Sequence, residues 1–133
     1  MKLNGAISGS GNLIFKDTLL AGTFNNADFG FILTGANTLS GTVTIGGPAE
    51  NGIPGRLTYV RVGGEGGDST ATGIGADGSL GTATIVNNGI LTFSLNSGIT
   101  VNTISGTGGL RVGYTAAAGA ESQNVTLTGV NPY

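Results

Sequence analysis

Short segments in which apolar and polar residues alternate recur along the whole chain. The clearest is Thr42-Val43-Thr44-Ile45, where Val43 and Ile45 share one face and the threonines share the other. This period of two is typical of a half-buried β-strand. The same pattern predicts strands over 57–62, three times within 83–101, and over 125–127, and the apolar run at 13–15, after a Ser/Gly corner, also predicts a strand. No segment has the i, i+3, i+4, i+7 spacing of an amphipathic helix, so we expect an all-β protein.

Gly or Asn follows nearly every predicted strand. Asn87-Asn88-Gly89 and Asn96-Ser97-Gly98 separate the three strands predicted within 83–101. At such corners Asn tolerates the left-handed backbone region, and its amide can stack on an Asn of the next layer of chain. The apolar positions expected to face the core of this region are Ala83, Ile85, Leu91, Phe93, Leu95, Ile99 and Val101.

Two motifs occur twice in the same order. ISGSGNL (7–13) is similar to ISGTGGL (104–110), and LTGAN (33–37) is similar to LTGVN (127–131). The second copies follow the first at nearly the same offset, which favours a stacked architecture. We therefore expect a parallel β-helix (solenoid) of about five or six coils, each of roughly 20–25 residues. An antiparallel β-sandwich is the alternative, because it also uses short, closely spaced strands.

Composition narrows the classes of partner. Gly supplies 27 of the 133 residues, far above its usual share of about 7%. There is no Cys, so neither a disulfide framework nor a thiolate metal site is possible. Five Lys and Arg residues against seven Asp and Glu residues, with no basic cluster, argue against nucleic-acid binding. No apolar run approaches the ~20 residues of a membrane-spanning helix, so we expect no membrane insertion by this segment.

Four segments resemble the passenger-associated β-strand repeat of Gram-negative autotransporters. They are LTGANTLSGTVTI (33–45), GSLGTATIVNNGILTF (78–93), VNTISGTGGL (101–110) and TLTGVNPY (126–133). Their order along this chain is the order of the family's repeat. The predicted strand at 57–62 and the Gly-rich run at 63–77 depart from the family's pattern.

The resemblance implies a right-handed parallel β-helix carried in a long passenger that is secreted or exposed on the cell surface. It implies that residues 1–133 form one β-solenoid segment, with a Gly-rich loop or insertion at 63–81. Because the second LTGxN copy is followed only by Pro132 and Tyr133, we expect a fragment of a longer passenger. The expected role is a structural stalk or spacer of an adhesin, with no catalysis of its own.

Two other functions remain open. One is a glycan- or protein-binding face of an adhesin or of a phage-type fibre, with a host or matrix molecule as partner. The other is the remnant of a polysaccharide lyase or hydrolase, in which Asp28 and Glu50, separated by close to one expected coil, would supply a carboxylate pair. We expect both acids to be ordinary surface residues. Arg61 and Arg111 each lie between inward apolar residues, and we expect both to point outward and maintain solubility.

The Gly-rich run contains a weak candidate for a calcium site. Residues 63–80 approximate two calcium-binding nonapeptides and place Asp68 and Asp77 at equivalent positions of successive copies. The position that should be large and apolar is Thr70 in one copy and Ser79 in the other. We therefore expect a Gly-rich loop and no bound metal or cofactor.

The ends of a solenoid segment expose unpaired strand edges, and such edges recruit other chains. We therefore expect this segment to self-associate by end-to-end stacking of coils.

Overall fold

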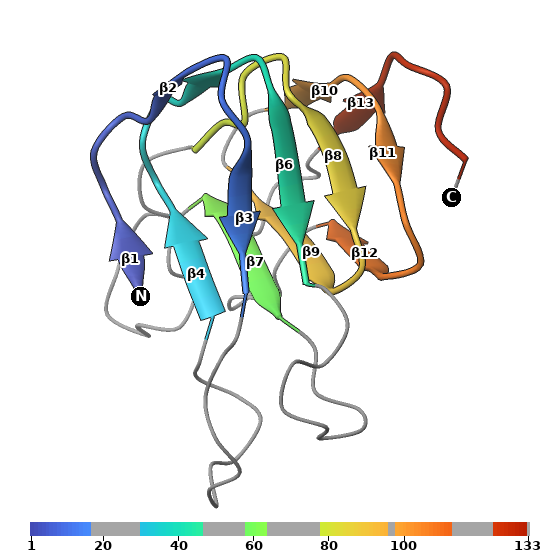
Figure 1. Cartoon of the computed structure of the whole chain (residues 1–133), viewed down its shortest axis with the longest axis horizontal. Helices are drawn as coiled ribbons and strands as arrows, with labels where there is room; N and C mark the ends of the chain where they lie inside the picture. Colours follow the sequence, from blue (N-terminus) through green and yellow to red (C-terminus); the bar gives the residue numbers. More distant parts are fainter. Residues whose placement is uncertain (17–29, 47–57, 64–77, 96–97, 113–123, 133) are drawn as a thin grey trace, which may run out of the picture.

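The chain folds entirely into short β-strands within the residues that its structure, a computed structural model, describes. These are residues 1–16, 30–46, 58–63, 78–95, 98–112 and 124–132. They contain thirteen strands and no helix (Figure 1). The expected all-β class is therefore confirmed.

The strands form two larger sheets and two strand pairs. The five-stranded sheet has the order β1 (Lys2–Leu3), β4 (Gly30–Leu33), β7 (Tyr59–Gly63), β9 (Ile90–Ser94) and β12 (Gly109–Val112). The four-stranded sheet has the order β3 (Leu13–Phe15), β6 (Thr42–Ile45), β8 (Thr84–Asn87) and β11 (Ile104–Ser105). The pairs are β2 (Ser8–Gly9) with β5 (Thr38–Leu39), and β10 (Ile99–Val101) with β13 (Val125–Leu127).

All nine strand pairings among the described residues are parallel. The chain alternates between the five-stranded and the four-stranded sheet, and we call each such round a pass. In the first, second and fourth passes a strand of a short pair lies between the two sheets, whereas β7 is followed directly by β8 and the fifth pass consists of β12 and β13. Strands of one pass then pair with strands of the next. An antiparallel sandwich would contain antiparallel pairs, whereas this mostly parallel arrangement is compatible with a β-solenoid.

The length of chain in one pass varies widely. Lys2 pairs with Ile32, whereas Val43 pairs with Ile85 after a much longer excursion. The spacing is shortest later in the chain, where Ile85 pairs with Ile104 and Ile90 pairs with Gly109. The expected coil of roughly 20–25 residues is therefore wrong for most passes. Strand lengths change little, so the difference lies in the connections between strands.

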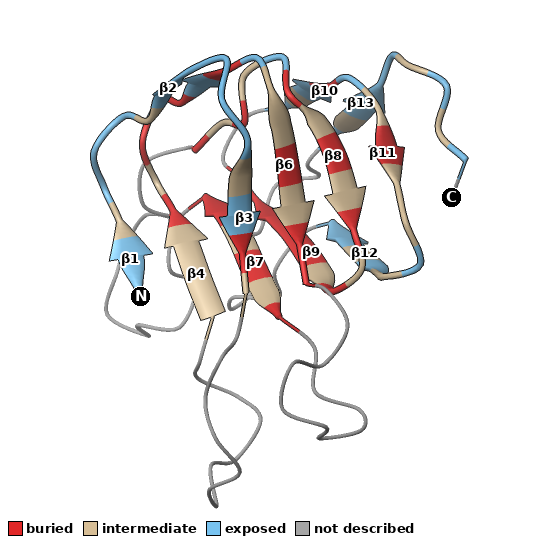
Figure 2. Cartoon of the chain, viewed as in Figure 1, coloured by how far each residue is buried: buried red, intermediate tan, exposed pale blue. Residues whose placement is uncertain are grey.

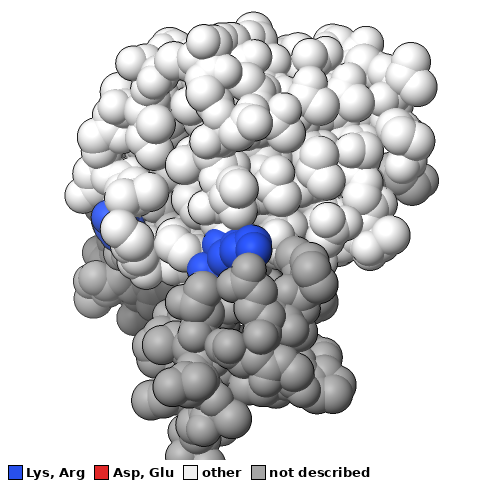
Figure 3. All heavy atoms as spheres, in the orientation of Figure 1, with Lys and Arg blue, Asp and Glu red and all other residues white. Residues whose placement is uncertain are grey.

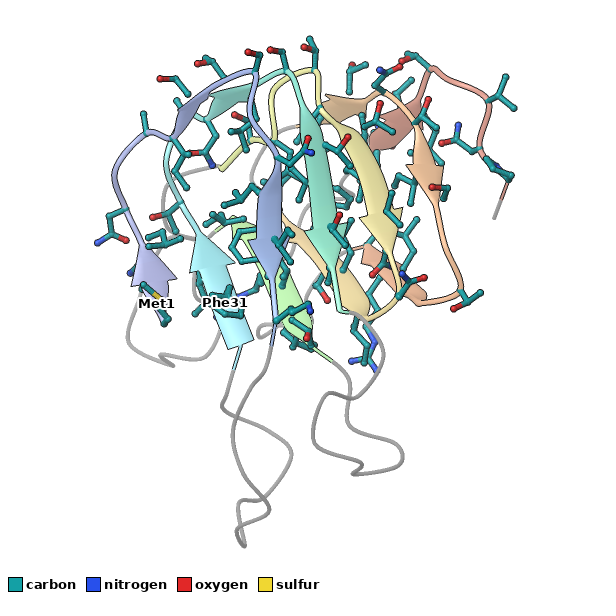
Figure 4. All side chains as sticks on the ribbon, viewed as in Figure 1. Met1 and Phe31 are labelled. Atoms are coloured by element: carbon teal, nitrogen blue, oxygen red, sulfur yellow. The ribbon has the colours of Figure 1, made fainter. Side chains whose placement is uncertain are left out.

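The core lies between the two larger sheets, which face each other in Figure 1. Val43 and Ile45 are 1% and 0% exposed, as the alternation in β6 predicts. The buried stripes continue through the neighbouring strands (Figure 2). Near the first strands, the Phe15 ring packs against Phe31, with ring centroids 4.9 Å apart. Phe31, labelled in Figure 4, is one of the partly buried side chains that border the core.

Five large apolar side chains remain exposed among the described residues, and all belong to the first or last strands of the stack or lie next to them. They are Met1, Ile14, Val112, Leu127 and Val130. Ile14 points outward from β3, on the side of the stack. Met1 and Ile14 belong to the first pass, next to or within edge strands of the two larger sheets. The other three belong to β12, to β13 and to the residues after β13. Both ends of the stack therefore present apolar surface.

The Gly-rich segment expected as a loop is anchored at both of its ends. Gly63 belongs to β7 and is buried, and Gly78 and Leu80 are also buried. The Ser79 N–H donates to the Gly35 carbonyl at 3.2 Å, so this end lies against the preceding pass. Residues 64–77 lie outside the described residues.

Candidate functional site

The acidic candidates fall outside the part of the chain that the structure describes. Asp28 and Glu50, proposed as a carboxylate pair, and Asp68 and Asp77, the calcium candidates, all lie in segments that it leaves undescribed. The same holds for the remaining three acids of the chain. The described residues contain no group of three or more His, Cys, Asp or Glu side chains that could hold a metal ion. The carboxylate-pair and calcium hypotheses therefore remain predictions.

The two repeated motifs contact each other through the same hydrogen bond in both copies. The Oδ1 atom of Asn37, in the first LTGxN copy, accepts the Ile7 N–H at 2.8 Å. The Oδ1 atom of Asn131, in the second copy, accepts the Ile104 N–H at 2.7 Å. Ile7 and Ile104 are the first residues of the two ISG copies. The repeated motifs are thus the two halves of one contact between successive passes.

The copies share local conformation but occupy different corners. Gly9 and Gly106, the third residues of the ISG copies, have φ angles of +124° and +108°, a region that L side chains rarely adopt. Yet Ile7 leads into β2, in a short pair, whereas Ile104 begins β11, in the four-stranded sheet. The near-constant offset of the two motifs therefore does not place identical corners on each other. The same pair of motifs, ISG with LTGxN, therefore forms the contact at two different corners of the fold.

The Asn37 amide is buried and hydrogen-bonds to two other passes. It is 2% exposed, and besides accepting from Ile7 it donates from Nδ2 to the Ser79 carbonyl at 2.8 Å. Ser79 in turn donates its hydroxyl to the Asn37 carbonyl at 2.5 Å. One side chain therefore joins three successive passes. Ser79, which occupied an apolar position of the nonapeptide pattern, belongs to this corner network.

A third corner, between β8 and β9, uses a different Asn. Asn87 is fully buried, and its Nδ2 donates to the Gly109 carbonyl at 2.9 Å. Its neighbour Asn88 accepts the Thr107 N–H at 3.2 Å. The predicted stacking role of Asn87-Asn88-Gly89 is confirmed, but the expected mechanism is wrong, because every positive φ among the described residues belongs to a Gly. Asn96 and Ser97 lie outside the described residues.

The outward face of the four-stranded sheet is uncharged. One row across its strands consists of Ile14, Thr44, Val86 and Ser105. Thr42 and Thr84 are paired beside this row. Figure 3 shows this face with basic side chains only along its lower margin. Among the described residues it offers hydroxyl and methyl groups, and neither carboxylates nor aromatic rings.

The outward face of the five-stranded sheet differs, because it carries most of the described charge. The strand register places Lys2, Ile32, Arg61, Thr92 and Arg111 in one row across all five strands. The sequence similarity of Val60-Arg61-Val62 to Leu110-Arg111-Val112 thus reflects equivalent places in one sheet. Both arginines point outward, as expected, since Val60 and Val62 are buried on the other face.

Two polar atoms on this face are buried without a hydrogen-bond partner, the Arg61 Nε and the Ser94 Oγ. Leaving a buried donor unsatisfied costs about 1–3 kcal/mol. Nearby, the Thr92 hydroxyl donates to the Tyr59 hydroxyl at 3.0 Å. Our sequence analysis did not single out Tyr59, Thr92 or Ser94. The available signal was their alternation with inward apolar residues, which places all three on the face that carries Arg61.

The described residues include no helix that is long and apolar enough to cross a membrane. The chain matches no protein-family model, and no curated protein and no solved structure is significantly similar to it.

Proposed function

We propose that the chain is a structural stalk or spacer segment of a secreted or surface-exposed, autotransporter-type adhesin. In this proposal it is a right-handed parallel β-helix, has no catalysis of its own, and belongs to a longer passenger. The sequence resemblance to the passenger repeat motivates the family. The parallel strand order supports the stacking.

The observation that carries the proposal is the recurring bond between the two motifs. Asn37 and Asn131 each join a corner of one pass to the start of a strand in the preceding pass. Side-chain hydrogen bonds between adjacent layers stabilise a solenoid, because each layer contacts only its neighbours. The repeated residues therefore serve the scaffold.

The uncharged face of the four-stranded sheet supports the same role. A glycan-binding or catalytic face would be expected to carry solvent-facing rings or carboxylates, whereas this row offers Thr, Ser and aliphatic groups. Binding of a host or matrix protein or glycan is the second candidate, and the basic row on the five-stranded sheet favours it. A polysaccharide lyase or hydrolase ranks third, since it depends on Asp28 and Glu50.

We also propose that copies stack end to end. The first and last strands of each sheet have one unpaired edge among the described residues. The exposed side chains of Met1, Val112, Leu127 and Val130 lie at these ends. Unpaired edges with apolar neighbours are the surfaces on which further strands add.

Spin labels at outward positions of the four-stranded sheet test the parallel stacking of strands within one chain. With Cys at Ile14 and Ser105, three strand spacings apart, we expect label separations near ~14 Å, from ~4.8 Å per strand. With Cys at Thr44 and Ser105, two spacings apart, we expect about 10 Å. Dipolar broadening that is absent from both doubly labelled proteins, relative to the singly labelled controls, would contradict the fold.

Antibody labelling of intact source cells tests the location. We expect an antibody raised against the chain to label unpermeabilised cells or the culture medium, while an antibody against a cytosolic enzyme labels neither. Labelling only after permeabilisation would overturn the surface proposal.

The absence of catalysis is tested by reducing-sugar release from several polyanionic glycans. We expect no turnover. Turnover that is abolished by Asp28→Ala and retained in Glu121→Ala would establish the enzyme alternative instead.

A further inference from the structure

Two Asn-Gly pairs lie among the described residues, both in connections between strands. Asn4-Gly5 follows β1, and Asn88-Gly89 lies between β8 and β9. In such a pair the backbone nitrogen of the Gly can attack the side-chain amide of the Asn, because Gly has no Cβ to obstruct the approach. A third pair, at residues 51 and 52, lies outside the described residues.

The Asn88-Gly89 pair is held in a closed corner. The Gly89 N–H donates to the Asn87 Oδ1 at 3.1 Å, and the Asn88 N–H donates to the Ile45 carbonyl at 2.7 Å. Gly89 is buried, and a Cβ at this position would strike the Thr58 carbonyl. The Gly89 nitrogen therefore cannot approach the Asn88 side chain unless this corner opens.

The Asn4-Gly5 pair is open to solvent. Both residues are exposed, and a Cβ at Gly5 would meet nothing within 4 Å. Among the described residues the Gly5 N–H has no hydrogen-bond partner. The Asn4 Oδ1 accepts the Thr34 hydroxyl at 2.9 Å, but the Asn88 Oδ1 also accepts a hydrogen bond, at 3.2 Å. The difference between the two pairs therefore lies in their glycine nitrogens.

We propose that Asn4 is a site of spontaneous deamidation in the folded chain, and that Asn88 is protected from this reaction. The Gly5 nitrogen forms a bond to the Asn4 Cγ, the Cγ–Nδ2 bond breaks, and ammonia leaves with the proton of the Gly5 nitrogen. Water then opens the resulting cyclic imide. Its addition at Cγ gives aspartate, and its addition at the main-chain carbonyl carbon gives isoaspartate. The inference depends neither on the stalk proposal nor on end-to-end stacking.

Either product changes the corner that follows β1. Both products add a carboxylate, and isoaspartate also lengthens the main chain by a methylene group. This corner lies close against the next pass, because the Thr34 N–H donates to the Leu3 carbonyl at 3.1 Å and a Cβ at Gly35 would strike the Gly5 carbonyl. The longer main chain of isoaspartate cannot keep both contacts, so we expect the first pass to loosen.

Peptide mapping of the aged full chain tests the site. Cleavage after Lys and Arg places the three Asn-Gly pairs in separate peptides, 3–16, 17–56 and 62–111. After incubation of the folded chain in mildly alkaline buffer, mass spectrometry should find Asn4 converted at least about tenfold faster than Asn88, because the Asn88 corner must first open. Equal rates at the two residues would overturn the proposal. So would an Asn4 that stays unmodified over the time in which the urea-unfolded chain reacts.

The urea-unfolded chain separates the effect of the fold from that of the sequence. In it Asn4 and Asn88 should react at similar rates, because each precedes a Gly. An Asn88 that stays slow when unfolded would show that the corner does not protect it.

Gly5→Ala tests which nitrogen attacks. It should slow the reaction at Asn4 by about tenfold or more, since the added methyl obstructs the approach. It should not lower the urea midpoint, because no atom lies near that methyl. An unchanged rate in folded Gly5→Ala would show that the Gly5 nitrogen is not the attacking group.

Hydrogen exchange measures the loosening of the first pass. The Thr34 amide should exchange at least about tenfold faster in the purified isoaspartate form than in the unmodified chain. Asn4→Asp is the matched control, because it adds the charge without lengthening the main chain, and it should leave this amide protected. Equal protection of the Thr34 amide in the isoaspartate form would overturn the loosening.

Discussion

At the scale of single residues, Asn and Gly have different roles at the corners of the chain: Asn forms hydrogen bonds and Gly adopts positive φ angles. Asn37, Asn87 and Asn131 hydrogen-bond to backbone groups of neighbouring passes. Gly9 and Gly106 adopt the positive φ angles. Because the two tasks need different chemistry, an Asn cannot replace a corner Gly without strain, and a Gly cannot replace a corner Asn without leaving backbone groups unsatisfied.

Asn37→Ala should lower the free energy of unfolding by about 2–4 kcal/mol, because it removes the partner of the Ile7 N–H and of the Ser79 carbonyl in a part-buried corner. Urea denaturation followed by circular dichroism measures this change. Asn12→Ala is the matched control, since Asn12 is exposed and its amide oxygen accepts the Thr42 N–H at 3.2 Å. This control should cost less than ~1 kcal/mol. Equal losses in both variants would contradict the role given to Asn37.

Gly106→Ala and Gly9→Ala separate backbone strain from collision. Both residues have positive φ, so each change should cost about 1–3 kcal/mol from strain alone. A Cβ at Gly106 would also strike the Asn87 carbonyl, whereas a Cβ at Gly9 meets nothing within 4 Å. Gly106→Ala should therefore cost a further ~1–3 kcal/mol, as overpacking does. Similar urea midpoints for the two variants would show that the Asn87 backbone moves away.

At the scale of the elements, alternation decides which side of each strand meets the core. In β8, Ile85 is fully buried, whereas Val86, the next residue, faces outward and is half-buried. The same rule holds in β6 and β7. This explains why short strands with only two inward side chains each can still build a continuous apolar layer when they stack in register.

Ile85→Ala should lower the free energy of unfolding by about 2–4 kcal/mol, the usual cost of a cavity in a packed core. Val86→Ala, one position along the same strand, should cost less than ~1 kcal/mol, because its side chain is not part of that core. Urea denaturation of both variants measures the difference. A larger loss in Val86→Ala would mean that β8 presents its other face to the core.

The sequence predicted these elements well because their information is local. Thr42–Ile45 is the predicted strand without change, and the inward residues Ala83, Ile85, Leu91, Phe93 and Leu95 are all buried. The length of each pass was not predictable, because the local pattern of apolar and polar residues does not indicate how many residues separate two paired strands. For the same reason the sequence did not reveal that Asn37 meets Ile7, or that Ser94 lies beside Arg61.

At the scale of the whole molecule, two different surfaces result. The sides carry outward polar or mixed residues together with the exposed Ile14, while the ends expose edge strands and the side chains of Met1, Val112, Leu127 and Val130. Growth along the stack would cover apolar surface and pair strand edges, whereas contact between the uncharged sides would gain neither. Association is therefore expected along the stack.

Light scattering should show a mass above that of the monomer as the chain concentration rises from about 1 to about 100 μM, because association follows mass action. The double change Leu127→Lys and Val130→Lys should keep the protein monomeric, since charge at an edge opposes strand addition. Thr44→Lys, on the side of the molecule, is the control and should leave association unchanged. A wild-type chain that stays monomeric throughout would contradict end-to-end stacking.

The unequal passes make the molecule tolerant of insertion. Neighbouring strands pair whether the chain between them is short, as from Ile85 to Ile104, or long, as from Val43 to Ile85. Doubling the length of a flexible connection costs only ~0.6 kcal/mol. New segments can therefore be gained or exchanged between strands without redesign of the layers beneath them. In evolutionary terms, the corner contact is the unit that must be kept, and the chain between corners is free to diversify, as it would in a scaffold that displays foreign peptides.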